Sequence, residues 1–267
     1  MIPVWKGRVI MPGKFSAGVY QVIRWCVKTV YPKIKVVGTE KLPQEPVILV
    51  GNHCKMNGPI SSELYAPGVH YTWCAGQMMH LKDVPQYAYQ DFWANKPRLL
   101  RPFYKLLSYV IAPLSVCVFN NANTIGVYHD TRILSTFKNT VVKLQEGANI
   151  VIFPEHDEDY NHILCEFQDK FIDIARLYYK RTGQRLAFVP MYLAPKLKSM
   201  HLGEAVRFDP ERPMEEERIR IRDYLMESIT QIAVSLPEHK VVPYRYIPKR
   251  LHPSNKSGEV IHEETGG

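Results

Sequence analysis

The chain has 267 residues, of which 46% are hydrophobic and 22% charged, so it can build a full core and has the length of one α/β domain, alone or with a small appendage. Its formal net charge of +8 favours anionic partners such as phosphorylated substrates or an acidic membrane surface. The basic residues are scattered and form no run of five or six, which argues against a nucleic-acid-binding tail.

The cysteines and the N-terminus narrow the cellular setting. Five dispersed cysteines without a CxxC pair indicate reduced thiols in the cytoplasm, and neither a disulfide framework nor a cysteine-based zinc site. Prolines, glycines and charges stand where a signal peptide needs an apolar core. The apolar runs are shorter than a spanning helix requires, so we expect any membrane contact to be peripheral.

Residues 14–31 are predicted to form an amphipathic helix that ends before Pro32. On a helical projection, a narrow cationic face carries Lys14, Gln21, Arg24 and Lys28. Apolar side chains spread over much of the rest: Phe15, Val19, Val22, Trp25, Cys26 and Val30. Such a helix can lie in a lipid interface, where Trp25 and Phe15 would insert. The alternative is that it packs on the domain core, which predicts a buried Trp25.

Strands and helices alternate along the rest of the chain. Strands are predicted at 33–38, 46–53, 71–79, 114–119, 149–154 and 186–193. Helices are predicted at 59–65, at 84–111 with breaks near Pro97 and Pro102, and from Asp130 to a stop at Gly147, then at 166–183 and 213–236. The helix after Asp130 has apolar residues at 3–4 spacing: Leu134, Phe137, Val141 and Leu144.

This alternation favours an α/β fold with a single domain, built on a mainly parallel mixed sheet flanked by helices. We expect residues 1–32 to form an N-terminal amphipathic helical segment and residues 33–252 the α/β domain. Residues 253–267 are polar and glycine-rich, and we expect them to be a disordered tail.

Two strand ends carry the candidate chemistry. The strand at 46–53 delivers Asn52 and His53, and ligands collect at the carboxyl ends of strands in open α/β sheets. The strand at 149–154 runs into Phe153, Pro154 and Glu155 and then an acidic stretch. Packing acids together there causes self-repulsion, so perturbed pKa values are expected.

The acidic stretch also offers potential metal ligands, namely His156, Asp157, Asp159, His162 and Cys165. Their spacing matches no common metal site, and acidic loops are mostly just solvated. We therefore expect no metal.

The two strand ends, about 100 residues apart, resemble the glycerolipid acyltransferase family, whose best-known members acylate lysophosphatidic acid. The family's first motif is Asn-His, four residues, then Asp, and its third is Phe-Pro-Glu-Gly. Here they stand as "NHCKMNG" from Asn52 to Gly58 and "FPEH" from Phe153 to His156. The resemblance covers roughly residues 30–195, including "VVGTEKLPQEPVILVGNH", "LQEGANIVIFPEH", "EFQDKFIDIA" and "FVPMYL".

Three positions depart from the family pattern. Gly58 occupies the place of the Asp, and His156 the place of the motif-three Gly. The stretch that corresponds to the second motif, "CVFNNANTIG", has Asn120, Asn121 and Asn123 where the family usually carries an Arg for the substrate phosphate.

The resemblance implies direct acyl transfer from acyl-CoA or acyl carrier protein to a lysophospholipid or glycerol-phosphate-type hydroxyl, with no cofactor. His53 would be the general base, which is worth about 10²–10⁴-fold in rate. Since the dyad Asp is absent, we expect Glu155 or Asp157 to supply the acid, with Asn57 able to orient the ring. Substrate-binding roles are implied for Asn52, Asn57, Gly58, Asn121, Phe153, Pro154 and His156.

The implied partners are a lipid substrate, an anionic membrane surface and acyl carrier protein, in phospholipid biosynthesis at the cytoplasmic side of a membrane. One alternative is a catalytically impaired lipid-binding relative of the family. Another, an unrelated α/β hydrolase, is disfavoured because no G-x-S-x-G elbow is present.

Overall fold

The computed structural model describes residues 14–93, 97–128 and 130–257. Contacts divide the chain into two compact units, residues 1–31 with 74–126 and residues 32–73 with 127–267. We call them the small unit and the sheet unit. Residues 74–126, which the sequence assigns to the α/β domain, therefore cluster with helix α1, because α1 packs on α4 within the small unit.

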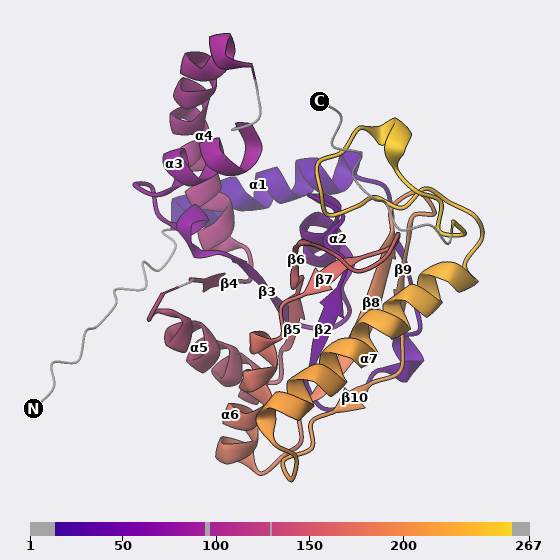
Figure 1. The fold of residues 1–267 in the computed structure, drawn as a ribbon. Helices are drawn as coiled ribbons and strands as arrows, with labels where there is room; N and C mark the ends of the chain where they lie inside the picture. Colours follow the sequence, from indigo (N-terminus) through magenta and orange to yellow (C-terminus); the bar gives the residue numbers. More distant parts are fainter. Residues whose placement is uncertain (1–13, 94–96, 129, 258–267) are drawn as a thin grey trace, which may run out of the picture. The chain divides into compact units, whose positions relative to one another are not determined.

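The sheet unit contains a mainly parallel sheet, in the order β1-β9-β8-β2-β5-β3, which confirms the predicted fold class (Figure 1). β2 pairs in parallel with β5 and β8, while β9 and β10 are antiparallel to β8. The strands are β1 (Lys35–Val37), β2 (Val47–Gly51), β3 (His70–Ala75), β5 (Asn149–Ile152), β8 (Ala187–Ala194), β9 (Ser199–Leu202) and β10 (Val206–Arg207).

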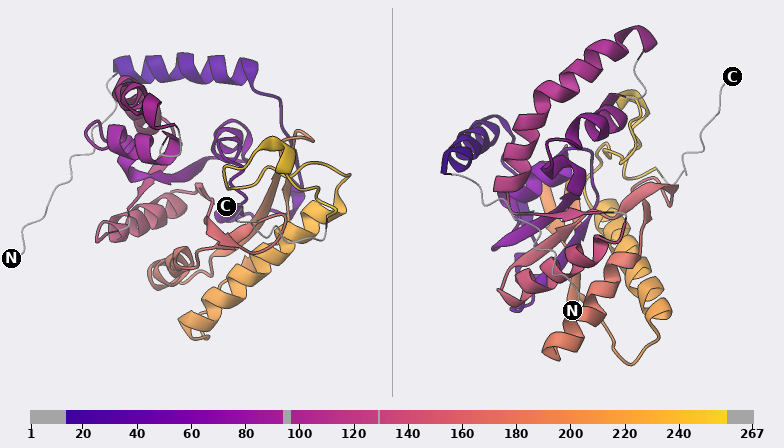
Figure 2. Two further views of the ribbon diagram at one scale, coloured as in Figure 1. Left: turned by 45° about the horizontal axis from the view of Figure 1, so that its top comes forward. Right: turned by 90° about the vertical axis from the view of Figure 1, so that its left-hand side faces the viewer.

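Every residue of β2 and β8 is buried, as expected for central strands with both faces covered. The helices of this unit are α2 (Asn57–Tyr65), α5 (Ile133–Gln145), α6 (Asp173–Thr182) and α7 (Met214–Ser235). In Figure 2, α5, α6 and α7 lie along one face of the sheet and α2 lies on the other. α7 packs on β8, and its apolar residues Ile221, Leu225 and Ile229 are fully buried.

A two-stranded hairpin of β6 (Glu155–Asp159) and β7 (Cys165–Phe167) follows β5. The sequence predicted a loop at β6 and a helix from residue 166. The helix begins only at Asp173, after a 3-10 turn, and ends at Gly183, whose φ of 72° is left-handed. The acids of β6 are tolerated in a strand because the hairpin leaves Asp157, Glu158 and Asp159 exposed.

The small unit is mostly helical. Its elements are α1 (Lys14–Val30), α3 (Val84–Ala88), a π turn (Tyr89–Trp93), α4 (Arg101–Asn121) and β4 (Thr124–Val127). The strand predicted at 114–119 is wrong, because these residues are the last turns of α4. Pro102 does not break the helix, because it stands in the first turn, where a missing N–H is tolerated.

The predicted helix at residues 14–31 is present as α1. The alternative in which it packs on a core through a buried Trp25 is not observed. Trp25 is 67% exposed and Val22 63% exposed, whereas Tyr20 is buried. The side chains of Lys14 and Phe15 lie outside the described part of the structure.

The predicted disordered tail is wrong for residues 253–257. Asn255 is fully buried, accepts a hydrogen bond from the His239 backbone N–H at 2.8 Å, and donates one to the Ala233 carbonyl at 2.8 Å. These bonds hold the segment against the end of α7. Residues 258–267 lie outside the described residues.

Candidate active site

The parallel pairing of β2 with β5 brings the two predicted motifs together. Val50 is opposite Ile152, so the residues that follow each strand leave the same edge of the sheet. His53 and Phe153 are thereby brought into edge-to-face contact, with ring centroids 5.4 Å apart. A separation of about 100 residues in sequence thus becomes a contact in space.

Asn52 is a structural anchor. It is 2% exposed, its Oδ1 accepts from the Leu193 N–H at 2.7 Å, and its Nδ2 donates to the Leu193 carbonyl at 3.0 Å. The Asn52 amide therefore extends the hydrogen bonding between β2 and β8 by one residue pair, as a backbone amide would. Both polar atoms of the amide bond the main chain, and the predicted substrate-binding role of Asn52 stays a prediction.

The loop between β2 and α2 is strained. Cys54 and Lys55 have φ angles of 48° and 58°, in the left-handed region that non-glycine residues rarely adopt. Such residues cost of order 1–3 kcal/mol each and cluster at functional sites. The turn is closed by the N–H groups of Asn57 and Gly58, which donate to the carbonyls of Cys54 and His53.

Gly58 has no room for a side chain unless its neighbours move. A Cβ there would lie 2.4 Å from the His53 carbonyl oxygen and 3.0 Å from the Phe153 ring. A side chain at this position therefore requires the main chain of the turn to shift. Asn57 begins α2 and donates from Nδ2 to the Cys54 carbonyl at 3.0 Å.

Glu155 reaches His53 through the main chain. Its Oε2 accepts from the His53 backbone N–H at 2.5 Å, and its Oε1 accepts from the Cys165 N–H at 3.1 Å. Burial raises the pKa of this carboxyl to about 7, although the two N–H groups act to lower it. Glu155 thus ties the first motif to the hairpin through two main-chain hydrogen bonds, and its role as the acid stays a prediction.

Asp157 points to a different partner. It forms an ion pair with Arg245, and Asp159 pairs with the same guanidinium at 2.7 Å. Asp157 is 79% exposed at the side chain. Its position therefore clamps the C-terminal segment to the hairpin.

The C-terminal segment contributes an aromatic side chain that the sequence analysis missed. Tyr244 lies edge-on to His53, with ring centroids 5.8 Å apart, and Tyr246 lies under the Lys55 ammonium at 5.1 Å. The signal was present in the "PYRYIP" stretch, where two tyrosines flank an arginine between prolines. The local sequence pattern does not indicate that this stretch contacts the His53 loop, which lies almost 200 residues earlier in the chain.

Cys54 is not a nucleophile in this arrangement. Its thiol is buried and accepts from Asn52 Nδ2 at 2.9 Å. Burial, with the nearby Glu155 charge, holds the pKa of this thiol well above its usual range. These properties argue against a nucleophilic role for the Cys54 thiol.

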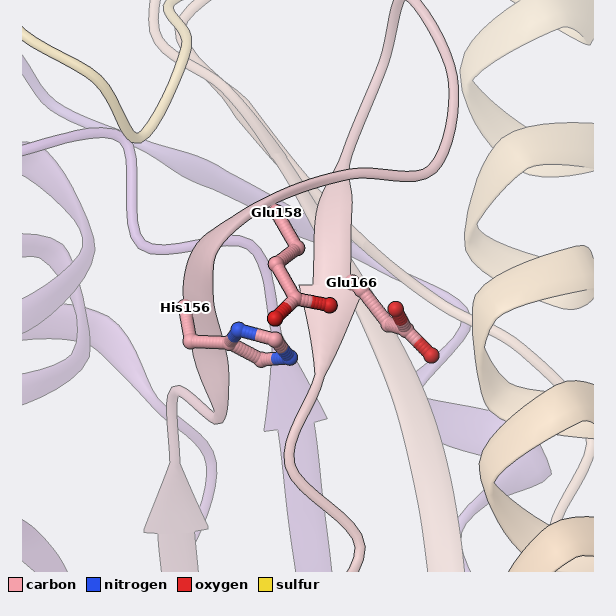
Figure 3. Close-up of side chains that lie close together, drawn as sticks. All are labelled: His156, Glu158 and Glu166. Atoms are coloured by element: carbon pink, nitrogen blue, oxygen red, sulfur yellow. The ribbon is translucent and has the colours of Figure 1, made fainter.

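Side chains alternate between the two faces of a strand. His156 and Glu158 of β6 therefore lie on the face opposite to that of Glu155, Asp157 and Asp159. Figure 3 shows His156 and Glu158 beside Glu166 of β7, and one ligand atom from each lies within 4.8 Å of the others. These three could hold a cation. Glu158 is exposed, however, and Glu166 also lies 3.4 Å from Arg222, so the cluster has the character of a solvated ionic group.

The remaining predicted residues have separate surroundings. Pro154 is buried and accepts from the Gln168 N–H at 3.0 Å. Asn121 ends α4 in the small unit, where its Nδ2 donates to the Cys117 carbonyl at 2.6 Å and to Ser16 Oγ at 3.3 Å. Of the potential metal ligands, His162 contacts the Asn255 carbonyl at 3.3 Å, and Cys165 has a buried thiol.

Comparisons with known proteins give a similarity of fold only. No protein-family model matches the chain, and no curated protein matches it. Among solved structures, the 1-acyl-sn-glycerophosphate (LPA) acyltransferase PlsC from Thermotoga maritima is similar, with 15% identity and a TM-score of 0.41. The similarity covers 82% of this chain and 79% of that one. A likeness at this level defines neither the family nor the activity.

Proposed function

We propose that the protein transfers an acyl group from a thioester to the hydroxyl of a lysophospholipid or glycerol-phosphate-type acceptor. His53 takes the hydroxyl proton as the oxygen attacks the thioester carbonyl. The carbon–oxygen bond forms, the carbon–sulfur bond breaks, and the thiolate leaves and is protonated. The observation that carries the proposal is the convergence of both motifs at one sheet edge, with His53 set between Phe153 and Tyr244.

The acid in this proposal is Glu155, acting through space. A buried carboxylate beside the His53 main chain places negative charge close to the imidazolium that forms during catalysis, in a medium that screens it poorly. The Glu155 charge also acts on Cys54 and Tyr192, whose pKa values are raised by burial and, to a smaller extent, by this charge. Glu155 is thus a positioning residue that also stabilises charge.

Cationic side chains around the loop would favour an anionic substrate. Lys55 stands two residues after the base, and its pKa is lowered by burial and by the nearby Lys249 charge. The charges of Lys196 and Lys249 also act on buried His252. These groups replace, in function, the arginine that the second motif lacks, and they suit a phosphate on the acceptor or on the acyl donor.

The second candidate function is a lipid-binding relative that has lost catalysis. Gly58 has no room for the dyad acid, and Asp157 is paired with Arg245, which together favour this alternative. Both proposals place an acyl-bearing lipid at His53. They differ only in whether the thioester is consumed.

Release of free thiol separates the two candidates. The purified chain is incubated with acyl-CoA or acyl carrier protein, with and without lysophosphatidic acid or glycerol 3-phosphate. Acyl transfer predicts acceptor-dependent thiol release together with an acylated product. Saturable binding of the acceptor without thiol release would favour the binding protein, and neither binding nor release would contradict both.

The setting proposed for this reaction is the cytoplasmic side of a membrane, in phospholipid biosynthesis, with acyl carrier protein as a further partner and no cofactor. The acceptor lipid resides in a bilayer, so the chain must reach its surface. The excess of basic residues and the exposed Trp25 of α1 support peripheral association.

A further inference from the structure

Helix α4 exposes its large apolar side chains. Phe103 is 59% exposed, Leu106 65%, Val110 65% and Leu114 52%. On a projection of 100° per residue, these four lie within an arc of about 80°. Leu99, in the turn that precedes α4, falls in the same arc and is 94% exposed. In a globular protein, the apolar face of a helix normally packs against the core.

The opposite side of α4 packs within the small unit through small residues. Ser108, Ala112 and Ser115 are buried, and Ser115 Oγ donates to the Met78 carbonyl at 3.2 Å. Ala112 belongs to a cluster with Val84 and Ala88 of α3. The helix is therefore fixed to its unit by the small-residue face, which leaves the large-residue face outward.

The small unit also carries the whole formal net charge. It has ten lysines and arginines against two acids, Asp83 and Asp91, which equals the +8 of the full chain, while the sheet unit is balanced. No acid occurs between Arg98 and Asn121. Three of the cations, Arg98, Arg101 and Lys105, stand in or just before the first turns of α4, on an arc opposite the apolar one.

We propose that α4 is the membrane-docking element, lying in the interface of an anionic bilayer with the Phe103–Leu114 face among the acyl chains. An apolar arc opposite a cationic one is the pattern of an interfacial helix. The charge balance of the unit selects anionic headgroups over zwitterionic ones. Exposed Val22, Trp25 and Val30 of α1, in the same unit, add apolar area.

Crossing the bilayer is the weaker use of this helix. Among the described residues, one helix, Arg98–Asn121, is long and apolar enough to cross a bilayer. Only 17% of its most apolar stretch is buried within the protein. Ser108 and Ser115, however, are packed against the unit, and Pro113 interrupts the hydrogen-bond ladder. Because one face of α4 is packed along its length, the other face can insert into a bilayer surface while the helix stays in its unit. This inference is independent of the proposed acyl transfer.

Co-sedimentation of the full chain with vesicles tests the proposal. Vesicles are made of phosphatidylcholine alone or with one third phosphatidylglycerol, at low and high salt. The apolar variant is Leu106→Gln with Val110→Gln, and its control is Leu134→Gln with Ile219→Gln, two exposed apolar residues of the sheet unit. The charge variant is Arg98→Gln, Arg101→Gln and Lys105→Gln, matched by exposed Arg176→Gln, Lys180→Gln and Arg181→Gln on α6.

Wild type and both controls are expected to bind the anionic vesicles and to be released by high salt. The apolar variant is expected to bind at least tenfold more weakly, and the charge variant on the order of a hundredfold more weakly at low salt. Thermal melts show whether each variant is folded, and since the changed side chains are exposed, melting temperatures should match wild type. Equal binding by the folded apolar variant, or no binding by wild type, would overturn the proposal. So would wild-type dimers that the apolar change converts to monomers, since the face would then join two copies.

Discussion

Gly58 decides what the catalytic loop can contain. A Cβ at this position would meet the His53 carbonyl at 2.4 Å, and backbone atoms cannot move aside as a flexible side chain can. We expect Gly58→Ala to lower the free energy of unfolding by about 1–3 kcal/mol. Denaturant unfolding measures it, with Gly18→Ala in α1 as control, because nothing lies within 4 Å of a Cβ there. A Gly58→Ala protein as stable as wild type would show that the turn adapts and can accept a side chain.

Glu155 and Asp157 have distinct environments and should behave differently. Glu155→Gln removes a buried carboxyl beside His53 and is expected to lower turnover by about 10²–10⁴-fold, because the imidazolium would lose the negative charge that stabilises it. Asp157→Asn removes only an exposed ion pair with Arg245, and turnover should stay within about threefold of wild type. The thiol-release assay on both variants measures this, and the reverse order would contradict the roles assigned here.

The sequence identified the motif residues but not where their side chains point. His53, Phe153 and Glu155 were all named, and the parallel pairing of β2 with β5 does bring them together. The target of Glu155 could not be predicted, because its orientation depends on a hairpin that turns it back under the His53 main chain. The partner of Asn52 could not be predicted for a similar reason, since Leu193 lies 141 residues away in the sequence.

At the scale of elements, short β structure was the least predictable. β6 consists of acidic residues that have low strand propensity, and it is stabilised by pairing with β7 rather than by its own composition. The opposite error occurred at 114–119, where β-branched residues suggested a strand inside α4. There the packing of small residues at helical spacing outweighs local propensity.

The C-terminal segment depends on Asn255. This buried side chain bonds the His239 N–H and the Ala233 carbonyl, and it secures the segment that brings Tyr244 to His53. Since Asn255→Ala leaves buried partners unsatisfied, we expect a loss of about 2–4 kcal/mol in the free energy of unfolding. Chemical denaturation checks this, with exposed Asn123→Ala as the control that should change little. A loss below 1 kcal/mol would mean that the segment is held by other contacts.

At the scale of the whole molecule, Glu155 gives the stability a pH dependence. Its pKa is raised from 4.5 to about 7 by burial, so folding favours the protonated form. The stability it contributes is fully present below pH 4.5 and is lost as pH rises through 7, roughly 3 kcal/mol over that window. His201 and His252 have lowered pKa values and act with the opposite sign.

Unfolding free energies of wild type and Glu155→Gln, measured from pH 4 to 8, isolate this contribution, because the histidines are common to both proteins. Wild type should lose stability relative to the variant as pH rises, with the difference levelling above pH 7. A pH-independent difference would show that folding leaves the pKa of Glu155 unchanged.

The overall architecture was more predictable than its division into units. Alternating strands and helices indicated the mainly parallel sheet, because buried parallel strands read as continuous apolar runs such as "VILV". The grouping of α1 with residues 74–126 was not predictable, since it depends on α1 packing against α4 across about 90 residues of sequence. The net charge of +8 was visible from the start, but its location in the small unit was not.

The most direct test of the central claim is acceptor-dependent thiol release by His53→Ala beside wild type, with His70→Ala as the control histidine. We predict that His53→Ala loses acyl transfer by about 10²–10⁴-fold while its melting temperature stays near that of wild type, because the half-buried side chain contributes little to the core. His70→Ala, at the half-buried start of β3, should retain full turnover. Full activity in a folded His53→Ala protein would contradict the assignment of His53 as the base.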